Sequence, residues 1–218
     1  MKKILLLLTS FGLLLSSHVC SASALQEAIH DLQVSWAKAN YKTPEDQLEN
    51  VFEALNRRAE SVVERFPGQA EPLIWSAIII STDAGKNGGF SALGKVKKSR
   101  ELLLEAEKIN AKALDGSIYT SLGSLYYQVP GWPIGFGDNE QAEKYLKQAL
   151  ALNPNGIDSN YFYADFLLDE GRYKEAVAYF TKALNAPARP NRHIADQGRR
   201  EEARTKLKLA KNNVGAGE

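Results

Sequence analysis

Few residues of this sequence have the side chains and the spacing that catalysis or metal binding requires. Beyond residue 24 the chain contains two histidines, His30 and His193, which lie far apart, and no cysteine. Catalysis needs a nucleophile, a base and an orienting group within reach of one another, and metal sites need several ligands at fixed spacing. Carboxylates are abundant, but most carboxylates of a helical protein face solvent. We therefore predict a protein that is not an enzyme, holds no metal and needs no cofactor.

A cluster of glycines at residues 84–89 has the composition of a phosphate-binding loop but not its pattern. The segment reads Ala-Gly-Lys-Asn-Gly-Gly, which lacks the GxxxxGK[ST] spacing, and no strand is predicted before it. Its glycines are therefore interpreted as turn residues.

The first 24 residues have the three parts of an export signal. Lys2 and Lys3 are followed by the apolar run Ile4–Leu15 and then by the small-x-small site that ends at Ala24. We predict a signal peptide over residues 1–24, cleaved after Ala24, and a periplasmic product. The alternative is a lipoprotein acylated at Cys20, although the residues before Cys20 are bulkier than those that lipoprotein signals carry. The apolar run is shorter than the roughly 20 residues that span a bilayer.

The overall charge gives no reason to expect a nucleic-acid partner. The chain has 27 Lys and Arg against 26 Asp and Glu, and predicted removal of the signal peptide takes away two lysines. A mature chain with one more acid than base has no general attraction for phosphate backbones.

An internal repeat decides the predicted fold. Three positions recur after a shift of 34 residues, which is the period of the tetratricopeptide repeat (TPR), a pair of antiparallel helices. The three pairs are Ala142 and Ala176, Leu146 and Phe180, and Ala149 and Ala183. The sequence therefore predicts an all-α, TPR-type helical-hairpin solenoid with about four helix pairs and a C-terminal capping helix.

The domain boundaries follow from the helical periodicity and the turn residues. After the signal peptide we predict an N-terminal helical pair over 25–70, TPR-like repeats over 71–187, a capping helix over 188–212 and a disordered tail over 213–218.

Two insertions interrupt the repeats between their paired helices. One is the segment from Val129 to Gly137, after which Asp138 is predicted to cap the next helix with Gln141 as its partner. The other is the segment from Asp83 to Phe90. Because both lie at the same point of a repeat, we predict that both loops emerge at the same edge of the stack.

Residues of the last repeats also carry a family resemblance. The stretches LGSLYYQVPGWPIGFGD, NPNGIDSNYFYADFLL and APARPNRHIADQGRR resemble exported bacterial TPR proteins, and most specifically the T component associated with TRAP transporters. The resemblance covers roughly residues 70 to 205. It implies a periplasmic solute-binding protein as partner, and it implies trimers for some members of the family.

The predicted binding site is a concave groove with a loop beside it. Because Tyr127, Tyr161 and Asp165 fall at inner-wall positions of first helices, we expect them to border one pocket with Trp132. Asp165 would select a cationic or hydrogen-bond-donating group, and Trp132 and Phe136 would form a lid. The alternative is that these aromatics only plug the edge of the stack. Further candidates are Asp83 at the groove and a possible anionic-partner patch of Arg189, Arg192, Arg199 and Arg200. The alternative for these arginines is that they cap the last helix and form salt bridges with it.

These observations predict a periplasmic binding or adaptor protein that holds a protein, peptide or small ligand. The rival hypotheses are an accessory protein of a cell-wall hydrolase and a scaffold whose repeats mediate self-association.

Overall fold

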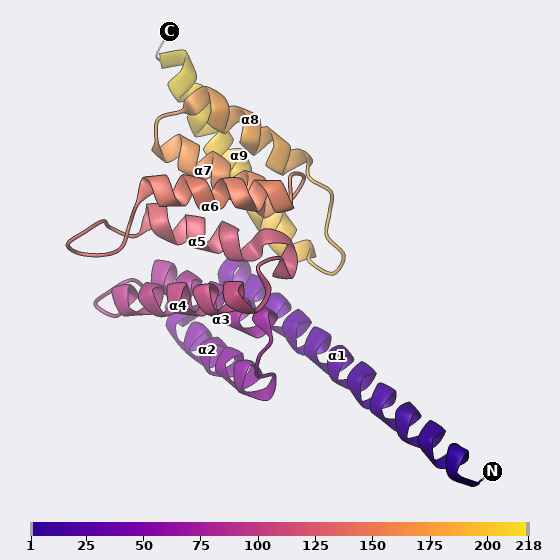
Figure 1. Ribbon diagram of the computed structural model, residues 1–218. Helices are drawn as coiled ribbons and strands as arrows, with labels where there is room; N and C mark the ends of the chain where they lie inside the picture. The colour runs from indigo at the N-terminus through magenta and orange to yellow at the C-terminus, as the bar shows by residue number, and fades with distance from the viewer. Residues whose placement is uncertain (1, 217–218) are drawn as a thin grey trace.

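The computed structural model describes the backbone of residues 2–216 and the side chains of residues 22–215. In this part of the chain the secondary structure is helical throughout, without strands (Figure 1). The helices are α1 (Lys2–Lys42), η1 (Glu45–Gln47), α2 (Leu48–Arg65), α3 (Ala70–Asn87), α4 (Ala92–Asn110), η2 (Ala113–Gly116), α5 (Ser117–Gln128), α6 (Asn139–Leu152), α7 (Ile157–Asp169), α8 (Tyr173–Asn185) and α9 (His193–Ala216).

Three helical hairpins, α3 with α4, α5 with α6, and α7 with α8, stack on one another to form the body of the protein (Figure 1). The six repeat positions, from Ala142 to Ala183, are all fully buried. A β-carbon added at Gly123 on α5 would lie 2.5 Å from Cγ of Leu146 on α6, so the two helices cross too closely for a side chain there. The predicted solenoid fold and its 34-residue register are therefore confirmed.

Local signals set the helix ends around the α5–α6 loop. The Asp138 side chain accepts a hydrogen bond from the backbone N–H of Gln141 at 3.0 Å and so caps the first turn of α6, as predicted. The Asp138 N–H in turn donates to the carbonyl of Tyr126 at 2.8 Å, which ties the loop to the end of α5.

The N-terminal helices pack onto the first repeat rather than standing apart as an isolated pair. The Trp36 indole of α1 meets the Trp75 ring of α3 edge to face, with 5.9 Å between centroids, and donates a hydrogen bond to Thr82 at 2.9 Å. The predicted export signal lies almost entirely outside the residues whose side chains are described, Cys20 included. Within those residues no helix is long and apolar enough to span a membrane.

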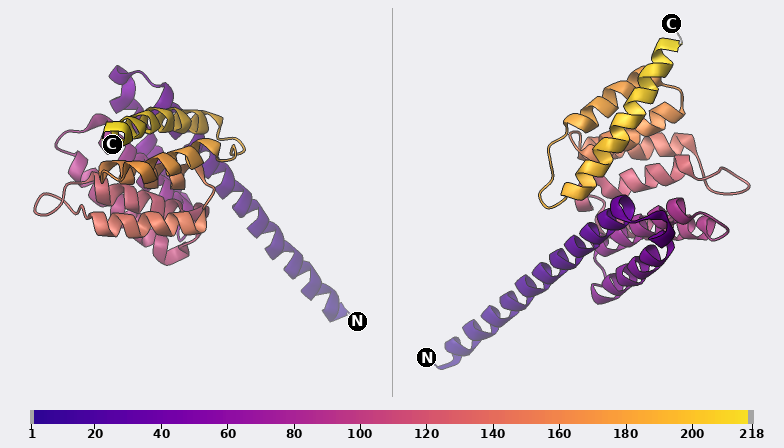
Figure 2. Two further views of the ribbon diagram at one scale, coloured as in Figure 1. Left: turned by 90° about the horizontal axis from the view of Figure 1, so that it is seen from above. Right: turned by 180° about the vertical axis from the view of Figure 1, so that it is seen from behind.

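Helix α9 runs along α7 and α8, and its first turns meet the end of α1 (Figure 2, right). The contact is close, because a β-carbon at Gly198 would lie 2.4 Å from the ring of Tyr41. The first and last helices of the described chain therefore touch.

Three predicted boundaries differ from the structure. The segment that begins at Asp83 was predicted as a loop, but α3 continues to Asn87 and only residues 88–91 connect it to α4. The capping helix begins at His193 rather than at residue 188, because prolines occupy positions 187 and 190. The predicted disordered tail is wrong for residues 213–216, which continue α9; the last two residues lie outside the described part.

Candidate functional site

Asp165 on α7 is the centre of the predicted groove, and the structure gives it partners from the chain itself. The Tyr127 hydroxyl of α5 donates a hydrogen bond to its Oδ2 at 2.9 Å, and the Lys206 ammonium of α9 pairs with its Oδ1. Asp165 is 7% exposed. Burial, and next the negative charge of Asp165, raise the pKa of Tyr127, so the phenol stays protonated and acts as a donor. The chain itself therefore supplies both kinds of group that we predicted Asp165 would select, the cation from Lys206 and the hydrogen-bond donor from Tyr127.

Tyr161 lies on α7 one turn before Asp165, and α9 covers it as well. Its ring is 4% exposed, and the guanidinium of Arg199 lies 4.5 Å from the ring centroid, in cation–π geometry. The Lys206 ammonium is 6.0 Å from the same centroid. Tyr127, Tyr161 and Asp165 are thus brought together as predicted, but α9 fills the space where we expected an open pocket.

The four arginines predicted as an anionic-partner patch are engaged within the fold. Arg189 and Arg199 both pair with Asp158 on α7, at 2.6 Å and 2.9 Å. Burial alone would raise the pKa of the Asp158 carboxyl, but these two guanidinium groups outweigh it and hold that pKa well below its usual range. The Asp158 and Arg189 side chains are 31% and 32% exposed, so solvent partly screens this pair and it contributes less to stability than a fully buried one.

The other two arginines also have internal contacts. The Arg192 guanidinium lies 5.0 Å from the ring centroid of Trp75 on α3, and Arg200 donates to the carbonyl of Ala186 at 2.9 Å. The arginine cluster therefore joins α9 to α7 and α3, which agrees with the predicted alternative of salt bridges at the last helix and not with an open patch.

Asp83 is a buried junction between helices rather than a groove residue. It is 3% exposed and accepts hydrogen bonds from Asn56 at 2.7 Å and Asn87 at 2.6 Å. The Lys95 ammonium, at the start of α4, forms an ion pair with the Asp83 carboxylate, with 2.8 Å between Nζ and Oδ2. These partners come from α2, α3 and α4, so Asp83 holds the first repeat to the helix before it, and its predicted role at the site is wrong.

The α5–α6 loop has a fixed base and an exposed tip. Phe136 packs at its base against Tyr126, with 5.4 Å between centroids, and the Arg100 guanidinium lies 4.3 Å from its ring. Trp132 and Ile134 at the tip are 89% and 65% exposed. Phe136 therefore behaves as the predicted alternative, a plug at the edge of the stack, while Trp132 is too exposed to close a lid over Asp165.

Phe90 extends the exposed apolar surface beyond the Trp132 loop. It lies in the short connection between α3 and α4, and its side chain is fully exposed. The α3–α4 and α5–α6 connections emerge on the same edge of the stack in every view, as predicted (Figures 1 and 2). We call Phe90, Trp132 and Ile134 together the loop edge. Phe90 and Ile134 were missed as site residues; the available signal was a large apolar residue beside glycines in each insertion.

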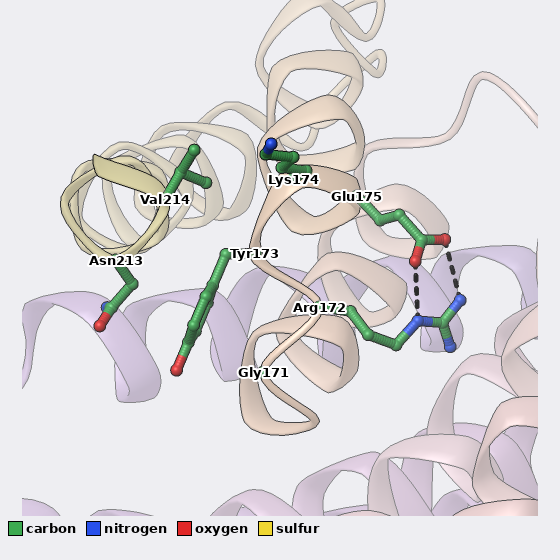
Figure 3. Close-up of a pocket in the computed structure, with 7 residues that line it drawn as sticks. All are labelled: Gly171, Arg172, Tyr173, Lys174, Glu175, Asn213 and Val214. Carbon is green, nitrogen blue, oxygen red and sulfur yellow. Dashed lines mark hydrogen bonds and ion pairs between the residues drawn. The ribbon is translucent and has the colours of Figure 1, made fainter. Parts of the chain in front are cut away.

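A shallow pocket of about 310 Å³ lies between the α7–α8 turn and the last turns of α9 (Figure 3). Arg172 borders it and pairs with Glu175 at 2.8 Å and with Glu143 on α6 at 2.7 Å. The hydrogen bond from Arg172 lowers the pKa of Glu143 to about 2, against the effect of burial. The pocket walls are thus shaped by a structural ion-pair network.

No constellation of potential metal ligands was found among the side chains that the structure describes. That the protein is not an enzyme stays a prediction, since nothing here tests catalysis.

Comparison with known proteins supports the repeat assignment. Residues 134–196 match the family model of the tetratricopeptide repeat, and no curated protein matches the chain. Among solved structures, a thermophilic TPR protein of Thermus thermophilus is similar, with 20% identity, a TM-score of 0.54, and coverage of 89% of this chain and 95% of that one. MamA from AMB-1 has 21% identity, a TM-score of 0.46 and coverage of 86% and 98%.

The family match and the Thermus thermophilus structure show the fold, and solenoids of this kind present extended surfaces to other proteins. A role in protein binding or as a scaffold is therefore supported. The chain therefore has an all-helical solenoid fold of the TPR type, and residues 134–196 carry the recognisable repeat.

Proposed function

We propose that this protein is an exported TPR adaptor that binds a protein partner through its loop edge. The observation that carries the proposal is the exposure of three large apolar side chains, Phe90, Trp132 and Ile134, on two neighbouring connections. Such residues are normally buried, and an exposed cluster of them at one edge marks an interaction site.

The base of the α5–α6 loop supports this role for its tip. The contact of Phe136 with Tyr126 and the hydrogen bond from Gly137 N–H to the Pro130 carbonyl, at 3.0 Å, hold the loop in place. An anchor held in position before binding loses less conformational entropy when the partner docks. Trp is also the residue type most often found to dominate binding energies.

We further propose that the partner meets the protein in the periplasm. The support for export is the sequence pattern of residues 1–24, and the resemblance to the TRAP-associated T component makes a periplasmic solute-binding protein our first partner to test. Mass spectrometry of the secreted protein should give an N-terminus at Leu25. A lipidated Cys20 or a retained Met1 would refute cleavage after Ala24.

Photo-crosslinking in living cells tests the loop edge directly. A photoreactive amino acid at position 132 should capture a partner, whereas the same group at Lys112, an exposed residue between α4 and α5, should not. Equal capture at both positions, or capture at neither, would contradict the proposal.

Affinity measurement with the captured partner then tests the anchor. We expect Trp132→Ala to weaken binding by about 2 kcal/mol, roughly 30-fold, because truncation of a buried Trp anchor typically costs this much. Trp132→Phe should retain most of the affinity, since it keeps an aromatic ring. Unchanged affinity in Trp132→Ala would show that the partner binds elsewhere.

Light scattering on the purified protein measures its oligomeric state and so tests the alternative of a self-associating scaffold. A strict monomer at micromolar concentration excludes that alternative.

A further inference from the structure

Two ion pairs join α7 to α9. Asp158 on α7 pairs with Arg199 on α9, and Asp165 pairs with Lys206. The two acids and the two bases are each seven residues apart, so both helices present one charge every two turns on one face. Tyr161 lies between the two acids and faces both cations.

The two helices have opposite overall charge. Helix α7 contains three Asp and neither Lys nor Arg, whereas α9 contains six Lys and Arg against three Asp and Glu. The complementarity therefore extends beyond the two contacting pairs, and it favours a basic helix on this face of α7.

Helix α9 is held by these ion pairs together with mostly small apolar side chains, and Ile194 and Leu207 pack against the core only in part. Its fully buried apolar residues are Ala195, Ala203 and Ala210, which have the smallest apolar side chains. By comparison, α8 buries Phe180 completely. Small side chains gain little from burial, and ion pairs with partly exposed partners weaken with salt. Helix α9 thus buries smaller apolar side chains than α8 does, and its ion pairs make up a larger part of its contact with the repeats.

We propose that the face of α7 formed by Asp158, Tyr161 and Asp165, here called the acidic face, is a binding site for a positively charged helix of another protein. Helix α9 occupies this site within the chain, and a partner helix with two basic residues seven positions apart replaces it. The site is separate from the loop edge and does not depend on the function proposed for that edge.

A labelled peptide with the sequence of residues 193–216 is the probe for this site. The full-length wild-type protein should bind it weakly, because its own α9 fills the acidic face. The double variant Arg199→Ala, Lys206→Ala, here called the freed protein, lacks both ion pairs between α9 and the acidic face. The peptide should therefore bind the freed protein at least ~10-fold more tightly than it binds the wild type. Fluorescence anisotropy measures both affinities.

Control variants keep the total charge and the fold comparable. Arg204→Ala with Lys208→Ala removes two positive charges from the exposed side of α9 and should leave weak binding unchanged. A peptide that carries the Arg199→Ala and Lys206→Ala changes should not bind. Adding Asp165→Asn to the freed protein should abolish binding of the unchanged peptide, and circular dichroism and thermal melting show whether each variant is folded.

Any of four results would overturn the proposal. The first is equal binding of the unchanged and the altered peptide by the freed protein. The second is no binding by a freed variant whose helical content and melting are those of the wild type. The third is a wild-type dimer in light scattering that is lost in the Arg199→Ala, Lys206→Ala variant, because it would assign the site to α9 of a second copy. Binding that survives the Asp165→Asn change also counts against the acidic face.

A second variant covers the case in which the freed protein fails to fold. Asp165→Asn alone leaves the sequence of α9 unchanged but removes the charge that pairs with Lys206. Release of α9 by this variant, seen as faster proteolysis at residues 186–192, is expected, and equal proteolysis contradicts the proposal.

Discussion

The crossing of α5 and α6 gives the sharpest test of the repeat register. Replacing Gly123 by Ala would put a β-carbon 2.5 Å from Cγ and 2.8 Å from Cδ2 of Leu146. Carbon atoms normally rest about 3.5–4.0 Å apart, so the helices must separate by roughly 1 Å. Overpacking of this kind costs about 1–3 kcal/mol, while exchanging Gly for Ala in a helix gains up to about 1 kcal/mol. We expect a net loss near ~1 kcal/mol in the free energy of unfolding.

Gly94 on α4 is the matched control, because a β-carbon there meets nothing within 4 Å. Gly94→Ala should therefore raise the free energy of unfolding, by up to about 1 kcal/mol. Urea denaturation followed by far-UV circular dichroism measures both variants. Similar shifts for Gly123→Ala and Gly94→Ala would refute the close crossing.

A double-mutant cycle then identifies the clashing partner. Leu146→Ala removes the two crowded atoms and by itself should cost about 2–5 kcal/mol, since Leu146 is fully buried. In that background Gly123→Ala should become stabilising, with a coupling energy of about 1–3 kcal/mol between the two sites. Zero coupling would mean that Leu146 does not limit the approach of the helices.

Three further predictions test other parts of the structure. Iodide should quench the fluorescence of Trp132, which is 89% exposed, and spare the other two tryptophans, so Trp132→Phe should remove most of the quenching. Because Arg172 lowers the pKa of Glu143 from 4.5 to about 2, this pair should stabilise the fold above pH 4.5 and lose its effect as the pH falls towards 2. Glu143→Gln should flatten that part of the stability profile, and an unchanged slope in urea titrations would contradict the assignment. Gly198→Leu should collide with the ring of Tyr41, lowering the melting temperature and speeding proteolysis of α9; melting like the wild type would show that α1 and α9 do not meet there.

The repeats could be predicted because their signal is local and recurs. Ala142 and Ala176 mark the same close crossing in two units, and a small residue at a fixed interval shows where helices meet. The N-cap at Asp138 could also be predicted from the sequence, because capping depends on residues within one helical turn.

The predictions that failed depended on contacts between distant segments. Asp83 precedes a glycine-rich stretch and was predicted as part of a loop, but Asn56 and Lys95 bind its carboxylate and the helix continues past it. Likewise, the repeat pattern predicted that Tyr161 and Asp165 lie on the inner wall of the solenoid, but it did not predict that α9 covers them. The seven-residue spacing of Arg199 and Lys206 matches that of Asp158 and Asp165, and it was the one sequence signal that α9 belongs on α7.

Salt should weaken binding at one of the two proposed surfaces and not at the other, so the two can be distinguished in one preparation. Contacts on the acidic face are ionic and partly exposed, so binding of the basic peptide should weaken between ~0.05 and ~0.5 M NaCl. Contacts at the loop edge come from Phe90, Trp132 and Ile134, whose burial does not depend on charge and is not weakened by salt. A partner whose affinity falls steeply with salt and is insensitive to Trp132→Ala therefore occupies the acidic face. A partner with the reverse behaviour occupies the loop edge, and each surface can fail its test without affecting the other.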